Sequence, residues 1–208
     1  MQVETLFFLI ILIFSIIIHE IAHGYMAEWF GDPTARLAGR LTLNPVPHID
    51  PLGSIILPAL MLLGSGGSFA FGWAKPVPYN PYNLRNFKWG TIFVGVAGVL
   101  ANLLLALIFG LMLRYNVELG IEVGPFTQML GTIVYLNIVL AVFNMIPFPP
   151  LDGAKVLFTL LPYRFQKIHD YLEANWLIFI VFVVFFASTI ISPISSLLFR
   201  VITGVGLF

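Results

Sequence analysis

The sequence contains no cysteine and has very little charge. The absence of cysteine excludes a disulfide framework and a thiolate metal site, so a bound metal would need histidine and carboxylate ligands. Only 10% of the 208 residues are charged and 59% are hydrophobic, whereas soluble domains have about 25% charged residues. The net charge of zero gives no indication of a nucleic-acid partner. This composition predicts an integral membrane protein surrounded by a lipid bilayer.

The N-terminal apolar run lacks the features of a cleaved signal peptide. Its first residues include Glu4 and no lysine or arginine, and the run continues without a small-residue cleavage site as far as His19. We therefore expect this run to be a retained membrane span.

Four stretches are long and apolar enough to approach the roughly 20 residues that a membrane span needs. They cover about 6–30, 91–113, about 126–146, and 176–199. Pro193 is expected to kink the last of them. The apolar segment 51–63 is shorter and contains Pro58. We expect it to be re-entrant or tilted rather than a full span.

Prolines interrupt the chain directly after the third predicted span, at Pro147, Pro149 and Pro150. The pattern predicts that the helix ends there, passes Asp152 and resumes as a short helix over 154–161. Irregular backbone at membrane depth is tolerated only where protein or a water-filled cavity surrounds it. The break is therefore expected to lie inside the protein.

Lysine and arginine are concentrated in three of the loops between predicted spans, namely 31–51, 64–90 and 162–175. The positive-inside bias places these loops in the cytoplasm if the N-terminus is outside and four segments cross. The segment 68–77, "SFAFGWAKPV", is predicted to hold a short strand or hairpin at the interface. The expected fold is an all-α membrane protein. It is a polytopic helical bundle of about four full spans with short re-entrant segments and a small interfacial β-hairpin.

The first predicted span contains three polar residues, His19, Glu20 and His23, in the stretch "IIIHEIAHGY". On a helix, residues i and i+4 share a face, so the two histidines can bind one zinc ion. In an H-E-x-x-H motif the glutamate is the general base rather than a ligand. Polar groups at membrane depth are costly, which argues against chance. The alternative is a set of polar residues that only make helix–helix contacts.

A catalytic zinc usually has a third protein ligand and an open position. His48, His169 and the carboxylates are available, and Asp152 stands out because it lies at the predicted break in the third span. An unpaired aspartate there would be costly, and Gly153 allows a sharp turn or a close helix approach. The alternative is that Asp152 caps the helix that follows it.

These two motifs together resemble the site-2 protease family of intramembrane zinc metalloproteases. The family pattern is H-E-x-x-H followed by N-x-x-P-x-x-x-x-D-G, found here as "HEIAH" and "NMIPFPPLDGAKV". The segment 97–106, "AGVLANLLLA", is similar to the small-residue and asparagine segment of the family. The resemblance covers roughly 5–165 and corresponds to a short form without a PDZ or CBS domain. It implies one Zn²⁺ per chain held by His19, His23 and Asp152, with Glu20 as catalytic base.

Two asparagines are further candidates for substrate binding or transition-state support. Asn102 lies in an apolar span, where it either makes an interhelical hydrogen bond or orients the substrate or the oxyanion. Asn144 could bind the substrate backbone or the scissile carbonyl, as the resemblance suggests, or bond free backbone carbonyls near the break. For His48 and Asp50, a polar interfacial turn is favoured over a role in the water path. The stretches 39–45 and 70–77 could supply an edge strand for an unwound substrate.

We therefore expect 1–208 to form one integral membrane metalloprotease domain, with its core at about 5–165 and an additional span at 176–199. The resemblance implies hydrolysis of a peptide bond within or near the transmembrane segment of a membrane protein or peptide substrate. The expected location is a prokaryotic cell membrane, with the active site nearer the cytoplasm. The alternatives are a non-enzymatic zinc-binding transporter or scaffold, or a hydrolase of lipids or other small amides. A transporter should have polar residues along a whole pathway, whereas here they converge at one depth.

Overall fold

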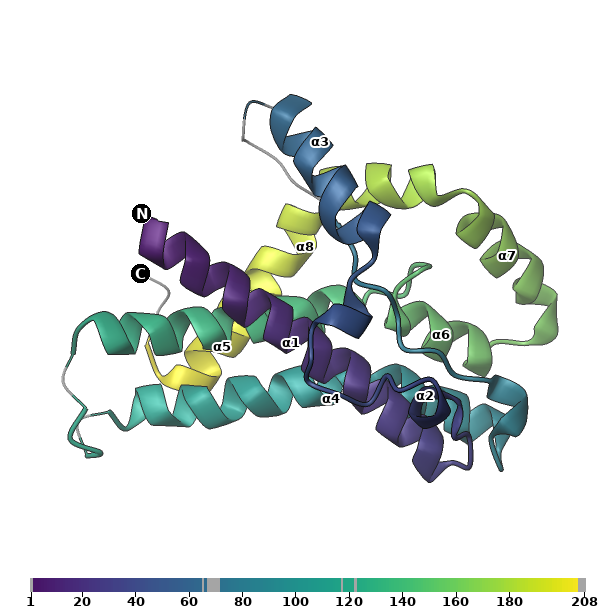
Figure 1. Ribbon diagram of the computed structural model, residues 1–208, viewed down its shortest axis with the longest axis horizontal. Coiled ribbons are helices and arrows are strands. Elements are labelled where there is room, and N and C mark those ends of the chain that lie inside the picture. Colours follow the sequence, from purple (N-terminus) through teal and green to yellow (C-terminus); the bar gives the residue numbers. More distant parts are fainter. Residues whose placement is uncertain (1, 65, 67–71, 117, 122, 206–208) are drawn as a thin grey trace.

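The computed structural model describes residues 2–64, 66, 72–116, 118–121 and 123–205. Within these ranges the chain is helical and forms no β-strand. Its four long helices are α1 (Gln2–Trp29), α4 (Phe87–Arg114), α5 (Pro125–Asn144) and α8 (Trp176–Thr203). Helix α4 packs against α1, α5, α8 and the short α6 (Asp152–Leu160), so it contacts each of the other long helices; in Figure 1 it runs along the lower side of the bundle.

Shorter helical elements connect the long ones. They are α2 (Thr34–Leu37), the 3₁₀ turn η1 (Val46–His48), the π-helical turn η2 (Pro51–Ile56), α3 (Leu57–Gly64), the 3₁₀ turns η3 (Pro81–Asn83) and η4 (Tyr163–Phe165), and α7 (Gln166–Ala174). No residue of α3 is buried, and Figure 1 shows this helix extending away from the bundle. At six and eight residues, η2 and α3 together are shorter than a membrane span.

Among the described residues, three helices are long and apolar enough to cross a membrane: Glu4–Trp29, Phe87–Arg114 and Pro125–Asn144. They coincide with the first three predicted spans, so the prediction of an integral membrane protein is confirmed. Helix α8 covers the fourth predicted span and continues through Pro193. The described apolar stretch within it, Thr189–Thr203, is shorter than a span. A fourth crossing therefore stays a prediction.

Small residues on α4 let the neighbouring helices approach closely. The buried positions of this helix include Gly95, Ala97, Gly98 and Ala106. In membranes, where lipid tails are as apolar as leucine, such residues favour helix association through close van der Waals contact. The polar residues of α1 can therefore pack against α4 instead of facing lipid.

The predicted break after the third span is confirmed. Helix α5 ends at Asn144, a proline-rich turn follows, and α6 begins at Asp152. At Gly153 a Cβ atom would collide with the carbonyl groups of Met145 and Ile146. Glycine is therefore required for α6 to fold back against the end of α5. The N-cap of α6 is Leu151, so the alternative role of Asp152 as a capping residue is wrong.

The predicted hairpin is not formed in its described part. Residues 68–71 lie outside the described residues, and 72–80 form neither a helix nor a strand. The N–H groups of Trp73 and Lys75 donate to the carbonyls of Gly53 (3.1 Å) and His48 (2.9 Å). Pro76 and Pro78 have no N–H and cannot continue a β-ladder. The other proposed strand, 39–45, consists of turns and bends.

Candidate metal centre

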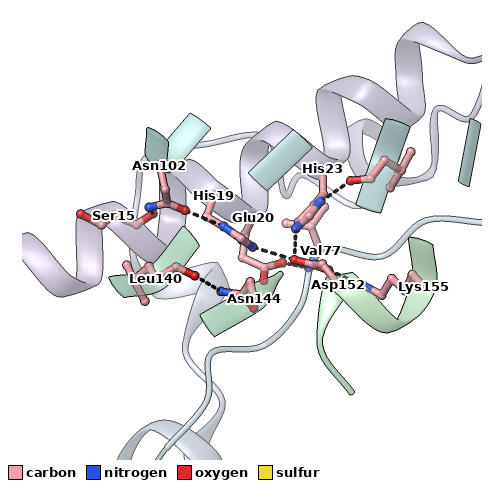
Figure 2. Close-up of polar contacts among 11 residues, drawn as sticks. Ser15, His19, Glu20, His23, Val77, Asn102, Leu140, Asn144, Asp152 and Lys155 are labelled. Atoms are coloured by element: carbon pink, nitrogen blue, oxygen red, sulfur yellow. Dashed lines mark hydrogen bonds and ion pairs between the residues drawn. The ribbon is translucent and has the colours of Figure 1, made fainter. Parts of the chain in front are cut away.

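Side chains from α1 and α6 meet at one buried point in the bundle (Figure 2). His19 Nε2 and His23 Nε2 lie 3.0 and 3.1 Å from the same oxygen, Oδ2 of Asp152. The three residues are 5–7% exposed. Within the described part of the chain they form a group whose ligand atoms all lie within 4.8 Å of one another. The structure thus brings together the three residues that the sequence predicts as ligands.

The donor set fits a zinc ion. Two imidazole nitrogens and one carboxylate oxygen are typical zinc ligands, and three protein ligands leave a fourth position for water or substrate. The site is buried, and both Nε2 atoms converge on one carboxylate oxygen at about 3 Å. At this distance either a proton on each ring or a cation bound among the three groups can join the nitrogens to the oxygen, so the donor set is compatible with a bound zinc ion.

Each histidine has a partner that orients its ring. His23 Nδ1–H donates to the carbonyl oxygen of Val94 on α4 at 2.6 Å. His19 Nδ1–H donates to Oδ1 of Asn102, also on α4, at 2.6 Å. A neutral imidazole with its proton on Nδ1 has a lone pair on Nε2. Helix α4 therefore turns the Nε2 atoms of both rings toward the metal position.

Lys155 orients the carboxylate. Its Nζ donates to Oδ1 of Asp152 at 2.8 Å from three residues further along α6. The other oxygen, Oδ2, is then directed at His19 and His23. Lys155 is not among the residues predicted from the sequence, although the i, i+3 spacing in "DGAK" places both side chains on one helix face.

Gly98 of α4 provides the space for His19. A Cβ atom at this position would lie 2.5 Å from Nε2 of His19. No side chain larger than hydrogen fits there while the imidazole stays in place. The small residues of this segment are apparent in the sequence, but the contact of Gly98 with the metal site is visible only in the structure.

Glu20 lies beside the three candidate ligands without joining them. Its Oε2 accepts a hydrogen bond of 2.7 Å from the backbone N–H of Val77 (Figure 2). Val77 belongs to the irregular segment 72–80, and Arg40 donates to the Lys75 carbonyl of the same segment at 2.6 Å. The segment therefore packs over the site and orients the Glu20 carboxylate.

The other predicted polar residues have distinct positions. Asn102 is fully buried and contacts His19, as described above. Asn144 donates from Nδ2 to the Leu140 carbonyl of its own helix at 2.9 Å. His48 contacts the Thr42 carbonyl at 2.9 Å and Asp50 accepts from the Gly53 N–H at 2.7 Å, as expected for a polar turn.

Asp32 connects the segment that follows α1 with the loop before α4. Its side chain is fully buried and accepts hydrogen bonds from the Asn80 N–H (2.6 Å) and Asn83 Nδ2 (2.8 Å). Burial by itself raises the pKa of Asp32, but hydrogen bonds from Thr34, Asn83 and Asn80 outweigh it and lower the pKa. The ionised carboxylate thus holds the end of the 72–80 segment near the site.

Comparison with known proteins matches the chain to a peptidase family and to proteins named zinc metalloproteases. The model of peptidase family M50 matches residues 119–188. The chain is 37% identical over 195 residues to "Putative zinc metalloprotease YwhC" of Bacillus subtilis (strain 168), covering 91% of this chain and 82% of YwhC. It is 32% identical over 140 residues to "Putative zinc metalloprotease Rip2" of Mycolicibacterium smegmatis, covering 67% and 51% of the two chains. The match to "Zinc metalloprotease MJ0392" of Methanocaldococcus jannaschii has 24% identity over 166 residues, covering 80% and 36%. No solved structure matches the chain.

Proposed function

Because the chain belongs to peptidase family M50 and is an intramembrane zinc peptidase of the site-2 protease type, we propose that His19, His23 and Asp152 hold its zinc ion and that Glu20 is its general base. The convergence of three buried donors from α1 and α6 on one point supports this assignment. The position of Glu20, next to a ligand but bonded elsewhere, supports its role as a base.

A zinc ion at this position would acidify a water molecule and polarise the scissile carbonyl. Glu20 takes the proton from the attacking water and returns it to the leaving amine. The N–H of Val77 occupies one carboxylate oxygen of Glu20 and so limits its rotation. Val94, Asn102 and Lys155 keep the three ligands in their orientations and need not move during the reaction.

The proposed substrate is the transmembrane segment of a membrane protein. Asn144 lies at the end of α5, where the helix breaks, and its bond to Leu140 uses one of two amide hydrogens. We assign its remaining hydrogen-bonding groups to the backbone of the unwound substrate. Asn102 supports the reaction through His19 rather than through the substrate, since its oxygen already accepts from the ring.

The proposed topology has four crossings, with α8 as the fourth, in one membrane domain over 1–208. His23 is six residues from the end of α1, which corresponds to a depth of about 9 Å at 1.5 Å per residue. The segments beyond that end contain Arg36, Arg40 and Lys75, which favours the cytoplasmic side. The named relatives come from bacteria and an archaeon, which supports a prokaryotic cell membrane.

The test combines zinc analysis of the detergent-purified chain with cleavage of a panel of single-span substrates. We expect one zinc per chain in wild type and in Glu20→Gln, with cleavage reduced by about 10²–10⁴-fold in the variant. A metal-replete, folded wild type without zinc would disprove the ligand assignment. Full activity of Glu20→Gln would disprove the assigned base. Zinc in both proteins without cleavage of any substrate would favour the transporter or scaffold alternative.

A further inference from the structure

Two asparagine side chains are completely buried between α4 and α5 and bond to each other. Nδ2 of Asn102 donates to Oδ1 of Asn137 at 2.8 Å, and both residues are 0% exposed. Nδ2 of Asn137 donates in turn to the carbonyl of Ile133, one turn earlier on α5, at 2.9 Å. With the bond from His19 to Asn102, these contacts form one continuous chain of hydrogen bonds from α5 to the metal site.

The Ile133 carbonyl determines which group donates and which accepts in each of these hydrogen bonds. The carbonyl oxygen of Ile133 can only accept, so Asn137 must turn its NH₂ group toward it and its Oδ1 toward Asn102. Asn102 must then present its NH₂ group to Asn137 and its oxygen to His19. Nδ1 of His19 must therefore carry a hydrogen. In the neutral ring this leaves the lone pair on Nε2, which faces Asp152.

His23 is held in the same tautomer by a direct hydrogen bond. Its Nδ1–H donates to the backbone carbonyl of Val94. His19 is connected to a backbone carbonyl, that of Ile133, through the side chains of Asn102 and Asn137. Both rings are thus held in the same tautomer by a group that can only accept hydrogen bonds.

We propose that Asn137 is a positioning residue for zinc binding, which selects the metal-binding tautomer of His19 by fixing the orientation of the Asn102 amide. This inference rests on the proposed role of His19 as a zinc ligand. Without the Asn137 oxygen, Nδ2 of Asn102 keeps only a 3.4 Å contact with the Ser15 carbonyl. The amide can then rotate and donate to Nδ1 of His19. That orientation favours the tautomer with hydrogen on Nε2, in which Nε2 has no lone pair for zinc until the hydrogen is removed.

The experiment measures the zinc dissociation constant of the purified full-length chain by competition with a chelator. Asn137→Leu removes the acceptor and should weaken binding by about 10-fold, within the range known for partners of metal ligands. Asn137→Asp has a similar volume and offers an oxygen lone pair to Asn102 in either protonation state, so it should keep wild-type affinity. Should Asn137→Leu fail to fold, Asn137→Ala also lacks the acceptor and takes its place.

Val134→Ala is the matched control for general destabilisation. Val134 is fully buried on the same helix, and it contributes to the apolar core formed with Ala106 and Phe199. Its truncation should lower the unfolding temperature without changing zinc affinity. Equal weakening in Val134→Ala and Asn137→Leu would overturn the inference, because loss of packing alone would explain it.

A second measurement reports the tautomer itself. In ¹⁵N-histidine-labelled protein, Nδ1 of the His19 ring, assigned by its absence in His19→Gln, should carry a hydrogen in wild type, whether Nε2 faces zinc or donates to Asp152 at 3.0 Å. In Asn137→Leu the share of His19 rings without a hydrogen on Nδ1 should increase. Zinc-binding wild type with unchanged affinity and tautomer in Asn137→Leu would overturn the inference while leaving the proposed function intact. Absence of zinc in wild type would instead refute the proposed function.

Discussion

The backbone N–H of Val77 donates a 2.7 Å hydrogen bond to Oε2 of Glu20, although the two residues are 57 positions apart in the chain. The segment containing Val77 is attached on both sides of this contact. Arg40 donates to the Lys75 carbonyl, and the Asn80 N–H donates to Asp32, each at 2.6 Å. The proposed base is therefore oriented by a segment from outside the long helices.

This contact predicts different stabilities for two substitutions of Glu20. Glu20→Gln keeps a side-chain oxygen for the Val77 N–H and should unfold at close to the wild-type temperature. Glu20→Ala leaves the N–H without that acceptor, at a cost of about 1–3 kcal/mol if water does not replace it. Thermal unfolding in detergent compares the two, and cleavage should be reduced by about 10²–10⁴-fold in both. Equal stability of the two variants would mean that the contact does not stabilise the fold.

Gly98→Ala should abolish tight zinc binding. The new Cβ would lie 2.5 Å from Nε2 of His19, whose ring is already held by Asn102. The ring must therefore leave its position, and we expect zinc affinity to fall by at least the 10–100-fold seen when a ligand loses its orienting partner. Gly110→Ala is the control on the same helix, because its Cβ would meet the Ile202 side chain of α8, away from the metal site. Wild-type zinc affinity in Gly98→Ala would contradict the geometry of the site.

Lys155→Met should weaken zinc binding by about 10-fold, because Oδ1 of Asp152 loses its 2.8 Å bond and the carboxylate can rotate. Lys155→Arg keeps a cationic donor and should recover most of the loss. The zinc dissociation constants of the three proteins test this prediction. If methionine and arginine have the same effect, the ion pair does not orient the ligand.

Asp32 predicts a pH dependence of stability. The pKa of its carboxyl is lower in the folded chain than in the unfolded chain. The contribution of the ionised Asp32 carboxylate to the free energy of unfolding is therefore fully present above the unfolded pKa of about 3.9. It is lost as the pH falls through the pKa of the folded chain. The unfolding temperature of wild type should exceed that of Asp32→Asn near pH 7, and the difference should shrink below about pH 4. A difference that grows on acidification would have the wrong sign.

Several features of this protein were determined by the sequence itself, because they depend on local chemistry. Apolar length predicted α1, α4 and α5, and the prolines after Asn144 predicted the end of α5. The i, i+4 spacing of His19 and His23 placed both imidazoles on one face of α1, where their ring centroids are 4.6 Å apart. Each of these properties depends on residues within one helix or one turn.

Only the tertiary structure decided what these residues contact. It placed Asp152 against histidines on α1 instead of at the N-cap of α6, and it placed Asn102 against His19. It also supplied Val77, Lys155 and Asn137, which the sequence analysis did not identify. Most of these contacts join positions far apart in the chain. They depend on how closely α1, α5 and α6 approach α4, and that distance is set by packing of small side chains such as Gly98 rather than by any local pattern.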